Sequence, residues 1–191
     1  MHGYLKTPRI IEEFKNVDRG DFVLPEARQS AYNDVSVPIG YGQTTSQPST
    51  VAFMLELLQP RAGERVLDIG SGSGWTSALL AYLVREQGGR VFSVEKEEGL
   101  QQLGDANLQK YAILAHNTIQ MFSQDGTTGL AQAGPFDKIL ADTGSRIGTP
   151  AIWREQLKIG GTIVAPVGQS IWAYTKRSPI EWLENEYRGF I

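Results

Sequence analysis

Short apolar runs alternate along this chain with longer segments whose apolar residues recur at helical spacing. Runs at 66–69, 90–95, 117–122 and 136–141 predict buried strands, and segments 8–17, 49–58, 76–84, 97–111 and 150–158 predict helices. Two further runs, 162–167 and 170–175, predict a closing strand pair joined through 168–169. Strands that alternate with helices indicate an α/β fold, with a mostly parallel sheet covered by helices on both faces.

The N-terminal part has a less regular pattern. Thr7 and Pro8 suit the cap and first position of the first helix, and Gly160-Gly161 suits the end of the last one. Segment 18–42 is irregular, yet it carries apolar residues that predict an ordered wrapping segment: Phe22, Val23, Leu24, Tyr32, Val35, Val37 and Ile39. We expect one domain over 1–191, with an N-terminal extension and substrate-side segment (1–47) and a cofactor-binding core (48–191).

A glycine-rich loop separates the first core strand from the helix that follows. Gly70, Gly72 and Gly74 occupy alternate positions between Ile69 and that helix. Such a break lets the backbone approach a ligand closely, with helix N–H groups directed at it. A flexible linker is the alternative, but linkers are not normally placed between an apolar strand and an apolar helix. The dinucleotide-binding pattern requires a glycine at position 75, where Trp75 stands.

Polar residues follow the other predicted strands as well. Glu95 ends the next strand, 21 residues after Gly74, and an acid roughly 20 residues beyond a glycine loop holds ribose hydroxyls in dinucleotide folds. Gln124-Asp125-Gly126 and the run from Asp142 to Ser145 follow two later strands. Asp125-Gly126 alone would be interpreted as a turn. Because ligands bind beyond the carboxyl ends of parallel strands, these loops predict one pocket.

Composition excludes several classes of protein. The chain has 191 residues, a net charge of −3, no cysteine and no cluster of Lys and Arg. These features argue against disulfides, a thiol nucleophile and a nucleic-acid partner that needs many phosphate contacts. No apolar run reaches membrane-spanning length and the N-terminus lacks a signal pattern, so we expect a cytoplasmic protein without a membrane partner. His2 and His116 have no partner at metal-ligand spacing, so no metal is expected.

The glycine loop resembles the first motif of class I S-adenosyl-L-methionine (AdoMet) methyltransferases, which have a Rossmann-like fold. From about Tyr4 to Val167 the chain resembles the protein-L-isoaspartate O-methyltransferases. The most specific stretch is Val37-Pro-Ile-Gly-Tyr-Gly-Gln-Thr-Thr-Ser-Gln-Pro48, which is similar to that family's segment before the first helix of the cofactor fold. A generic methyltransferase would share only the glycine loop, the ribose acid and Gly160-Gly161.

The resemblance implies a role for each matching position. Ser46 falls on the active-site serine, and the implied cofactor-binding residues are Thr44, Thr45, Asp68, Gly70, Ser71, Gly72, Gly74, Glu95, Lys96, Asp125 and Gly126. The implied reaction transfers a methyl group from AdoMet to the free α-carboxylate of an L-isoaspartyl residue in a damaged protein. S-adenosyl-L-homocysteine (AdoHcy) is the product, no metal takes part, and a monomer is expected. We expect Ser46 to orient the carboxylate, although it could instead cap the helix near Pro48.

Three positions depart from the family pattern. Gln124 replaces a glycine, Asp142 to Ser145 replaces small apolar residues, and the chain ends at Phe190-Ile191 where the family generally continues with another strand segment. An acid at position 142 would repel a carboxylate substrate if it faced the pocket. The alternatives are therefore an AdoMet methyltransferase for another carboxylate, a small molecule or a tRNA base, and a non-catalytic AdoMet-binding or peptide-binding module.

Overall fold

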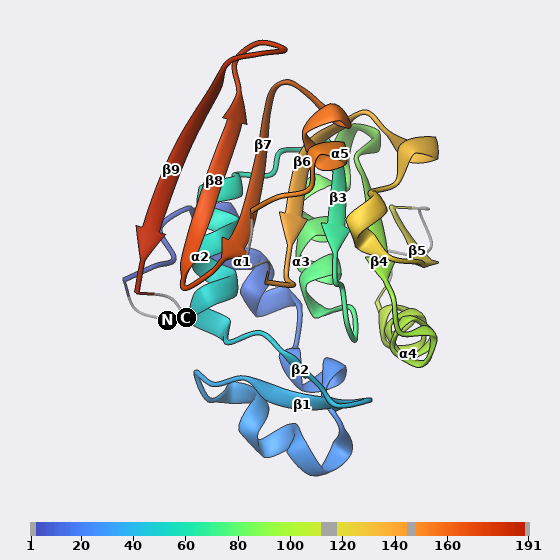
Figure 1. The fold of residues 1–191 in the computed structure, drawn as a ribbon. Coiled ribbons are helices and arrows are strands. Elements are labelled where there is room, and N and C mark those ends of the chain that lie inside the picture. The colour runs from blue at the N-terminus through green and yellow to red at the C-terminus, as the bar shows by residue number, and fades with distance from the viewer. Residues whose placement is uncertain (1–2, 112–117, 145–147, 190–191) are drawn as a thin grey trace.

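A seven-stranded sheet forms the centre of the computed structural model, which describes residues 3–111, 118–144 and 148–189 (Figure 1). Its strand order is β5-β4-β3-β6-β7-β8-β9. The strands are β3 (Arg65–Ile69), β4 (Arg90–Glu95), β5 (Ile119–Ser123), β6 (Phe136–Ala141), β7 (Leu157–Val167), β8 (Ser170–Lys176) and β9 (Trp182–Arg188). A separate pair, β1 (Val37–Gly40) and β2 (Gln43–Thr45), lies beyond one end of the sheet.

The sheet is mostly parallel, as predicted. Strands β5, β4, β3, β6 and β7 run parallel to one another, and the pairs β7–β8 and β8–β9 are antiparallel. In the central register Ile69 of β3 lies opposite Val94 of β4 and Ala141 of β6. The carboxyl ends of these three strands therefore meet at one edge, where a parallel sheet binds its ligands.

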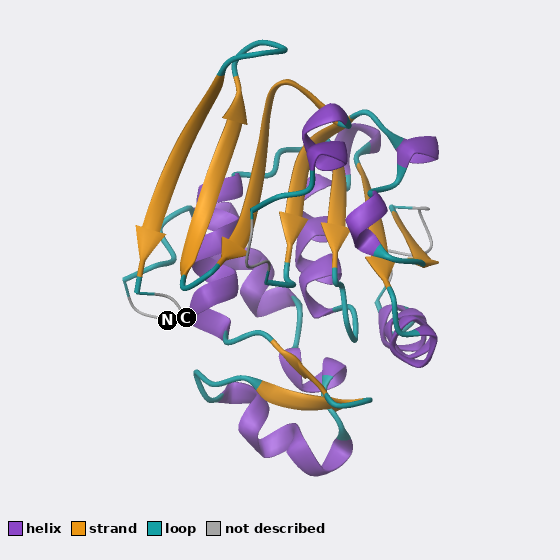
Figure 2. Ribbon diagram, in the orientation of Figure 1, coloured by secondary structure: helices purple, strands orange, loops and turns teal. Residues whose placement is uncertain are grey.

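Helices cover both faces of the sheet, but unequally (Figure 2). The helices are α1 (Pro8–Asn16), α2 (Pro48–Leu58), α3 (Trp75–Val84), α4 (Glu98–Leu108) and α5 (Ala151–Glu155). Residues of α1, α2 and α3 pack on one face in a large apolar core, together with strand residues such as Val66 and Leu140. On the other face Leu67 and Ile139 pack with Trp153 of α5 and with Ala133 of the short 3-10 turn Ala131–Ala133. None of the helices in the described ranges is long and apolar enough to cross a membrane.

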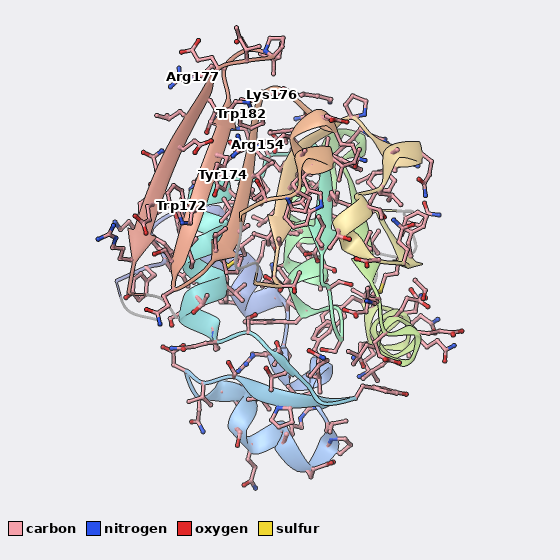
Figure 3. All side chains as sticks on the ribbon, viewed as in Figure 1. Arg154, Trp172, Tyr174, Lys176, Arg177 and Trp182 are labelled. Carbon is pink, nitrogen blue, oxygen red and sulfur yellow. The ribbon has the colours of Figure 1, made fainter. Side chains whose placement is uncertain are left out.

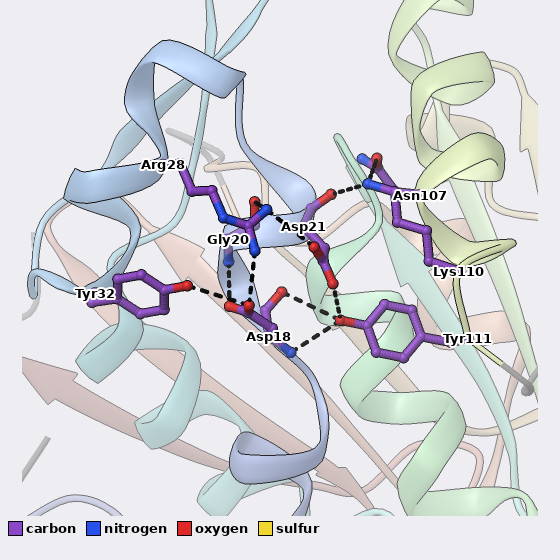
Figure 4. A network of polar contacts seen from close by, with 8 residues as sticks. All are labelled: Asp18, Gly20, Asp21, Arg28, Tyr32, Asn107, Lys110 and Tyr111. Atoms are coloured by element: carbon purple, nitrogen blue, oxygen red, sulfur yellow. Dashed lines mark hydrogen bonds and ion pairs between the residues drawn. The ribbon is translucent and has the colours of Figure 1, made fainter.

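The segment before β1 is anchored to the core by a polar network (Figure 4). It contains two 3-10 helices, Arg19–Phe22 and Pro25–Tyr32. The hydroxyl of Tyr111, just after α4, accepts a hydrogen bond from the backbone N–H of Asp18 at 3.0 Å and donates one to Asp21 at 2.9 Å. Lys110 Nζ donates to the carbonyl oxygen of Asp21 at 2.9 Å. These contacts confirm that the wrapping segment is ordered against the core.

Several local expectations need correction. Tyr32 and Val35 are 66% and 49% exposed, because the second 3-10 helix lies at the surface. Thr7 is the N-cap residue of α1, but its hydroxyl donates to Glu56 of α2 at 2.7 Å and makes no capping bond. Residues 37–42 belong to the segment expected to be irregular, but they form the β1–β2 hairpin together with 43–45. His2, His116, Asn117, Ser145 and Phe190-Ile191 lie outside the described residues.

The predicted helix over 150–158 is shorter than expected. Helix α5 ends at Glu155, and the glycine pair that was expected to stop it lies inside β7. The β6–β7 register shifts between Phe136 and Lys138, so β7 needs extra chain at this point. Gly160 has φ +84°, and a Cβ on Gly161 would lie 2.8 Å from the carbonyl oxygen of Asp137. The two glycines therefore permit a bulge and a close strand approach.

Strand β9 was not predicted from the sequence. It pairs with β8, and a cluster of aromatic and basic side chains lies where α5, β8 and β9 meet (Figure 3). The guanidinium of Arg154 lies 4.9 Å from the ring centroid of Tyr174 and 4.8 Å from that of Trp182, and it pairs with Glu184 at 2.9 Å. Lys176 Nζ donates to the carbonyl oxygens of Arg154 and Leu157. Cation–aromatic contacts thus join α5 to β8 and β9.

We predict that Gly161→Ala lowers the free energy of unfolding by about 1–3 kcal/mol, because the new methyl group would press on the β6 backbone. Gly144→Ala is the control, since a Cβ at Gly144 would have no atom of the described residues beyond its chain neighbours within 4 Å. Urea unfolding followed by circular dichroism measures both variants. If the two variants unfold at the same urea concentration, the close approach of β6 and β7 does not constrain this position.

Candidate active site

A cavity of about 770 Å³ opens at the carboxyl ends of β3, β4 and β6. Its walls also include β2 and the loops after β5 and β6. Ile39, Thr44, Ser46, Gly70, Gly72 and Asp142 line it and also line a smaller pocket of about 40 Å³. The larger volume lies in the range usual for small-molecule sites, which are about 300–1,000 Å³.

Glu95, at the end of β4, is fixed by backbone donors on both of its carboxylate oxygens. Oε2 accepts from the N–H of Gly72 at 2.9 Å, and Oε1 accepts from the N–H of Glu97 at 2.9 Å. Each carboxylate oxygen can accept a second hydrogen bond, and Glu95 lines the cavity. The side chain is thus a preorganised acceptor for a pair of hydroxyls, as a ribose requires.

The glycine loop can adopt its path because Gly70, Gly72 and Gly74 all have positive φ, at +79°, +54° and +94°. A Cβ on Gly70 would lie 3.1 Å from Cβ of Thr143, and one on Gly72 would lie 3.0 Å from Cδ1 of Ile39. Gly74 is the N-cap residue of α3. Side chains at Gly70 and Gly72 would therefore crowd the loop and the space that it borders.

The loop after β5 closes the other end of the cavity. Asp125 caps the 3-10 turn by accepting from the N–H and hydroxyl of Thr127 at 2.9 and 2.8 Å, and these bonds lower its pKa. Trp153 Nε1 donates to the carbonyl oxygen of Gly126 at 2.8 Å. Lys96 lies 3.8 Å from Asp125 at the rim, in an exposed pair that contributes little stability. Trp153 and Gly126 form a wall suited to an aromatic base.

Ser46 is positioned through its backbone by a buried arginine. Arg19 Nη2 donates to the carbonyl oxygens of Ser46 and Val35 at 2.9 Å, and Nη1 donates to that of Ala31 at 2.9 Å. The guanidinium lies 5.0 Å from the ring centroid of Trp75 in α3. Burial lowers the pKa of Arg19 to about 10, so it stays charged at neutral pH. Arg19 thus holds the Ser46 backbone close to the start of α3.

Ser46 does not cap α2, which was the alternative role. The N-cap residue of α2 is Gln47, without a capping side chain, and the N–H of Ser49 instead bonds Asp34 Oδ1 at 2.8 Å. Within the described residues no hydrogen bond holds the Ser46 hydroxyl. That hydroxyl is therefore available to a ligand in the cavity.

Two carboxyl groups lie under the glycine loop. Asp68 is fully buried and accepts a hydrogen bond from Ser77 in α3. Burial raises its pKa well above the usual value, and the nearby charge of Asp142 raises it further. Burial also raises the pKa of Asp142 to about 6, against the lowering effect of a hydrogen bond from Thr76. Asp68, which is the more deeply buried, is therefore the harder of the two carboxyl groups to ionise.

The cavity brings together most of the predicted site residues. The larger cavity is lined by Thr44, Ser46, Gly70, Gly72, Glu95, Lys96, Asp125 and Gly126, and the smaller pocket also by Thr45 and Ser71. Asp68 and Gly74 line neither, which corrects the expectation of direct contact: alternation along β3 turns Asp68 toward α3, and Gly74 serves as the N-cap. Among the described residues no three His, Asp or Glu side chains could together hold a metal ion.

Sequence reasoning missed two residues that shape the site. Trp153 was not among the predicted site residues, but it lines the cavity, and its place in the helix that follows the Asp142 loop was the available signal. Arg19 was not among the predicted site residues either. A lone charge between Val17 and Phe22 was a weak signal for a buried guanidinium.

Comparisons with known proteins agree with this geometry. Residues 1–186 match the family model of protein-L-isoaspartate(D-aspartate) O-methyltransferase. A Methanopyrus kandleri protein-L-isoaspartate O-methyltransferase is 40% identical, with 98% of this chain and 83% of that protein aligned. One from Aeropyrum pernix is 42% identical over 87% of this chain and 62% of its own length.

Solved structures share the fold. A protein-L-isoaspartate O-methyltransferase superposes with a TM-score of 0.82 at 26% identity, over 97% of this chain and 61% of that one. A Plasmodium falciparum protein of the same description, in complex with AdoHcy, gives a TM-score of 0.84 at 21% identity, over 99% of this chain and 91% of that one. This second likeness shows the fold alone.

We predict that Asp68→Asn stabilises the protein, relative to the unchanged chain, increasingly as the pH rises above 4. The unfolded carboxyl ionises near pH 4, whereas burial raises the pKa of the folded one well above that, so the unchanged chain loses folding stability as pH rises above 4. The amide cannot ionise and lacks this penalty. Urea unfolding at pH 5 and pH 8 measures the difference in free energy. If the two proteins differ in free energy of unfolding by the same amount at pH 5 and pH 8, the pKa of Asp68 is not raised in the folded state.

Proposed function

Because the chain belongs to the protein-L-isoaspartate O-methyltransferase family, we propose that its cavity binds AdoMet and presents an isoaspartyl carboxylate to it. The activity is methyl transfer to the α-carboxylate of L-isoaspartyl residues in damaged proteins, the first step of their repair. The observation that carries the proposal is the placement of Glu95, the glycine loop and Ser46 around one cavity. A cytoplasmic location and a monomeric state remain predictions.

Each part of the cavity suits one part of the nucleoside. Glu95 would accept hydrogen bonds from the ribose hydroxyls, because both of its oxygens are already oriented. Gly126 and Trp153 would hold the adenine, and the loop of Gly70 and Gly72 would hold the methionine end. When bound, AdoMet supplies an electrophilic methyl group on a positively charged sulfur. AdoHcy is the product, and the reaction needs no metal.

The residues near Ser46 perform positioning rather than proton transfer. A carboxylate, with an ordinary pKa of about 4, is already ionised at neutral pH and needs no general base. The chain's task is to align the reacting atoms, at roughly 3–3.5 Å in a reactive complex. The Ser46 hydroxyl would donate a hydrogen bond to one carboxylate oxygen and so fix the direction of the other. Opposite charges disappear in this reaction, so excluding water from the cavity also favours it.

The other readings fit the chain less well. A tRNA-base methyltransferase would need a basic face, and the chain has a net charge of −3 without a cluster of Lys and Arg. The match to the isoaspartate family model extends over residues 1–186. It favours the isoaspartyl substrate over a small molecule, another carboxylate or a non-catalytic role.

We predict that Ser46→Ala lowers kcat/KM for an isoaspartyl peptide about tenfold or more, because it removes a hydrogen bond to a charged group. Affinity for AdoHcy, measured by calorimetry, should change less than about threefold. Ser36→Ala is the matched control, since Ser36 also lines the cavity. Full activity of the Ser46 variant would remove its proposed role, and AdoHcy binding by both variants would leave the cofactor site intact.

A further inference from the structure

Asp142 is the unexplained group of this site. It follows β6 directly, where the family resemblance implied a small apolar residue. Its backbone N–H donates to the carbonyl oxygen of Ile69 at 2.8 Å, which fixes it beside the glycine loop. Asp142 lines both the large cavity and the smaller pocket, and its buried Oδ1 has no hydrogen-bond partner among the described residues. A buried carboxylate oxygen without a partner is costly unless a ligand satisfies it.

The smaller pocket has the chemistry of an amino-acid site. Hydroxyl groups border it on several sides, from Thr44, Thr45, Ser46, Ser71, Ser73 and Thr76. Among the described residues that line it, Asp142 is the one ionisable side chain. A small polar pocket with a single negative charge is complementary to a group with one positive charge and several hydrogen-bond donors, as an ammonium has.

Of the two neighbouring carboxyl groups, Asp68 and Asp142, the one that faces the cavity is the more readily ionised. Asp68 has no exposed surface and lies under the loop, whereas Asp142 is only partly buried and reaches the cavity. Two close carboxyl groups cannot both ionise cheaply, so the more solvated one holds the charge. Glu95 is the other charged group that affects Asp68, and backbone donors already satisfy both of its oxygens. Asp142 accepts a hydrogen bond from Thr76, but its Oδ1 is left without a partner among the described residues.

We propose that Asp142 binds the α-ammonium group at the methionine end of AdoMet, an assignment that rests on the proposed function. With the nucleoside between Glu95 and Trp153, the methionine end extends past Gly70 and Gly72 toward the smaller pocket. An ammonium there would neutralise Asp142 and supply the missing hydrogen bond to Oδ1. The same neutralisation would remove the repulsion that an acid at this position exerts on a carboxylate substrate. Asp142 therefore selects for cofactors that carry the amino group.

Calorimetry with two ligands tests this assignment: AdoHcy, and its desamino analogue, in which hydrogen replaces the ammonium. The unchanged protein should bind AdoHcy about tenfold or more tightly than the analogue, because a charge-assisted hydrogen bond is lost. Asp142→Asn should bind the two ligands with affinities within about threefold of each other. Asp105→Asn, which alters a carboxyl of α4 outside both cavities, should keep the original ratio. Asp142→Thr provides the comparison if the Asn variant does not fold.

The outcomes separate the two proposals. An Asp142→Asn protein that keeps the original preference for AdoHcy overturns the ammonium assignment and leaves the proposed function standing. So does a variant whose only change is a lower KM for an isoaspartyl peptide, because Asp142 would then act on the substrate. Failure of the unchanged protein to bind AdoHcy overturns the proposed function together with the assignment.

Discussion

The shape of this site depends on the hydrogen bonds that the buried guanidinium of Arg19 donates to backbone carbonyl oxygens. Its nitrogens donate to backbone carbonyls of residues far apart in the chain, including Ser46 at 2.9 Å, and its plane lies near the ring of Trp75. A loop has no ladder to hold its carbonyl groups, and one planar cation can bind several of them at once. Arg19 thus holds an irregular segment in one fixed conformation along the cavity. That conformation places Ser46 in the same cavity as the glycine loop.

The other wall comes from the sheet, and its polar groups are arranged in two layers. In the layer that faces the cavity, Glu95 holds the N–H of Gly72 and keeps acceptor capacity for a ligand. In the layer beneath, Asp68 accepts from Ser77, whose hydroxyl also accepts from Ser93 at 2.8 Å. The lower layer fixes the strand to α3, so the loop above it can stay free of side chains. The buried hydrogen bonds thus support the site, while the glycine loop above them leaves space for a ligand.

The sequence predicted the elements whose pattern is periodic and missed those set by long-range contacts. Strands β3, β4 and β6 and helix α3 lie where the apolar runs place them, because burial on both faces leaves few alternatives. Strand β9 was missed because its residues are mostly exposed, so its sequence has no apolar run that would indicate a buried strand. Gly160-Gly161 resembled a helix end, since local sequence does not reveal the β6–β7 register. In the site, Glu95 followed from spacing, whereas the direction of Asp68 and the role of Arg19 depended on packing.

The proposed function requires that AdoMet bound in this cavity gives its methyl group to an isoaspartyl carboxylate. The most direct test incubates the unchanged protein with AdoMet carrying a labelled methyl group and either an isoaspartyl peptide or the otherwise identical aspartyl peptide. We expect label in the isoaspartyl peptide alone, as an ester that releases labelled methanol in mild base. Equal labelling of both peptides, base-stable label, or no label in either would contradict it.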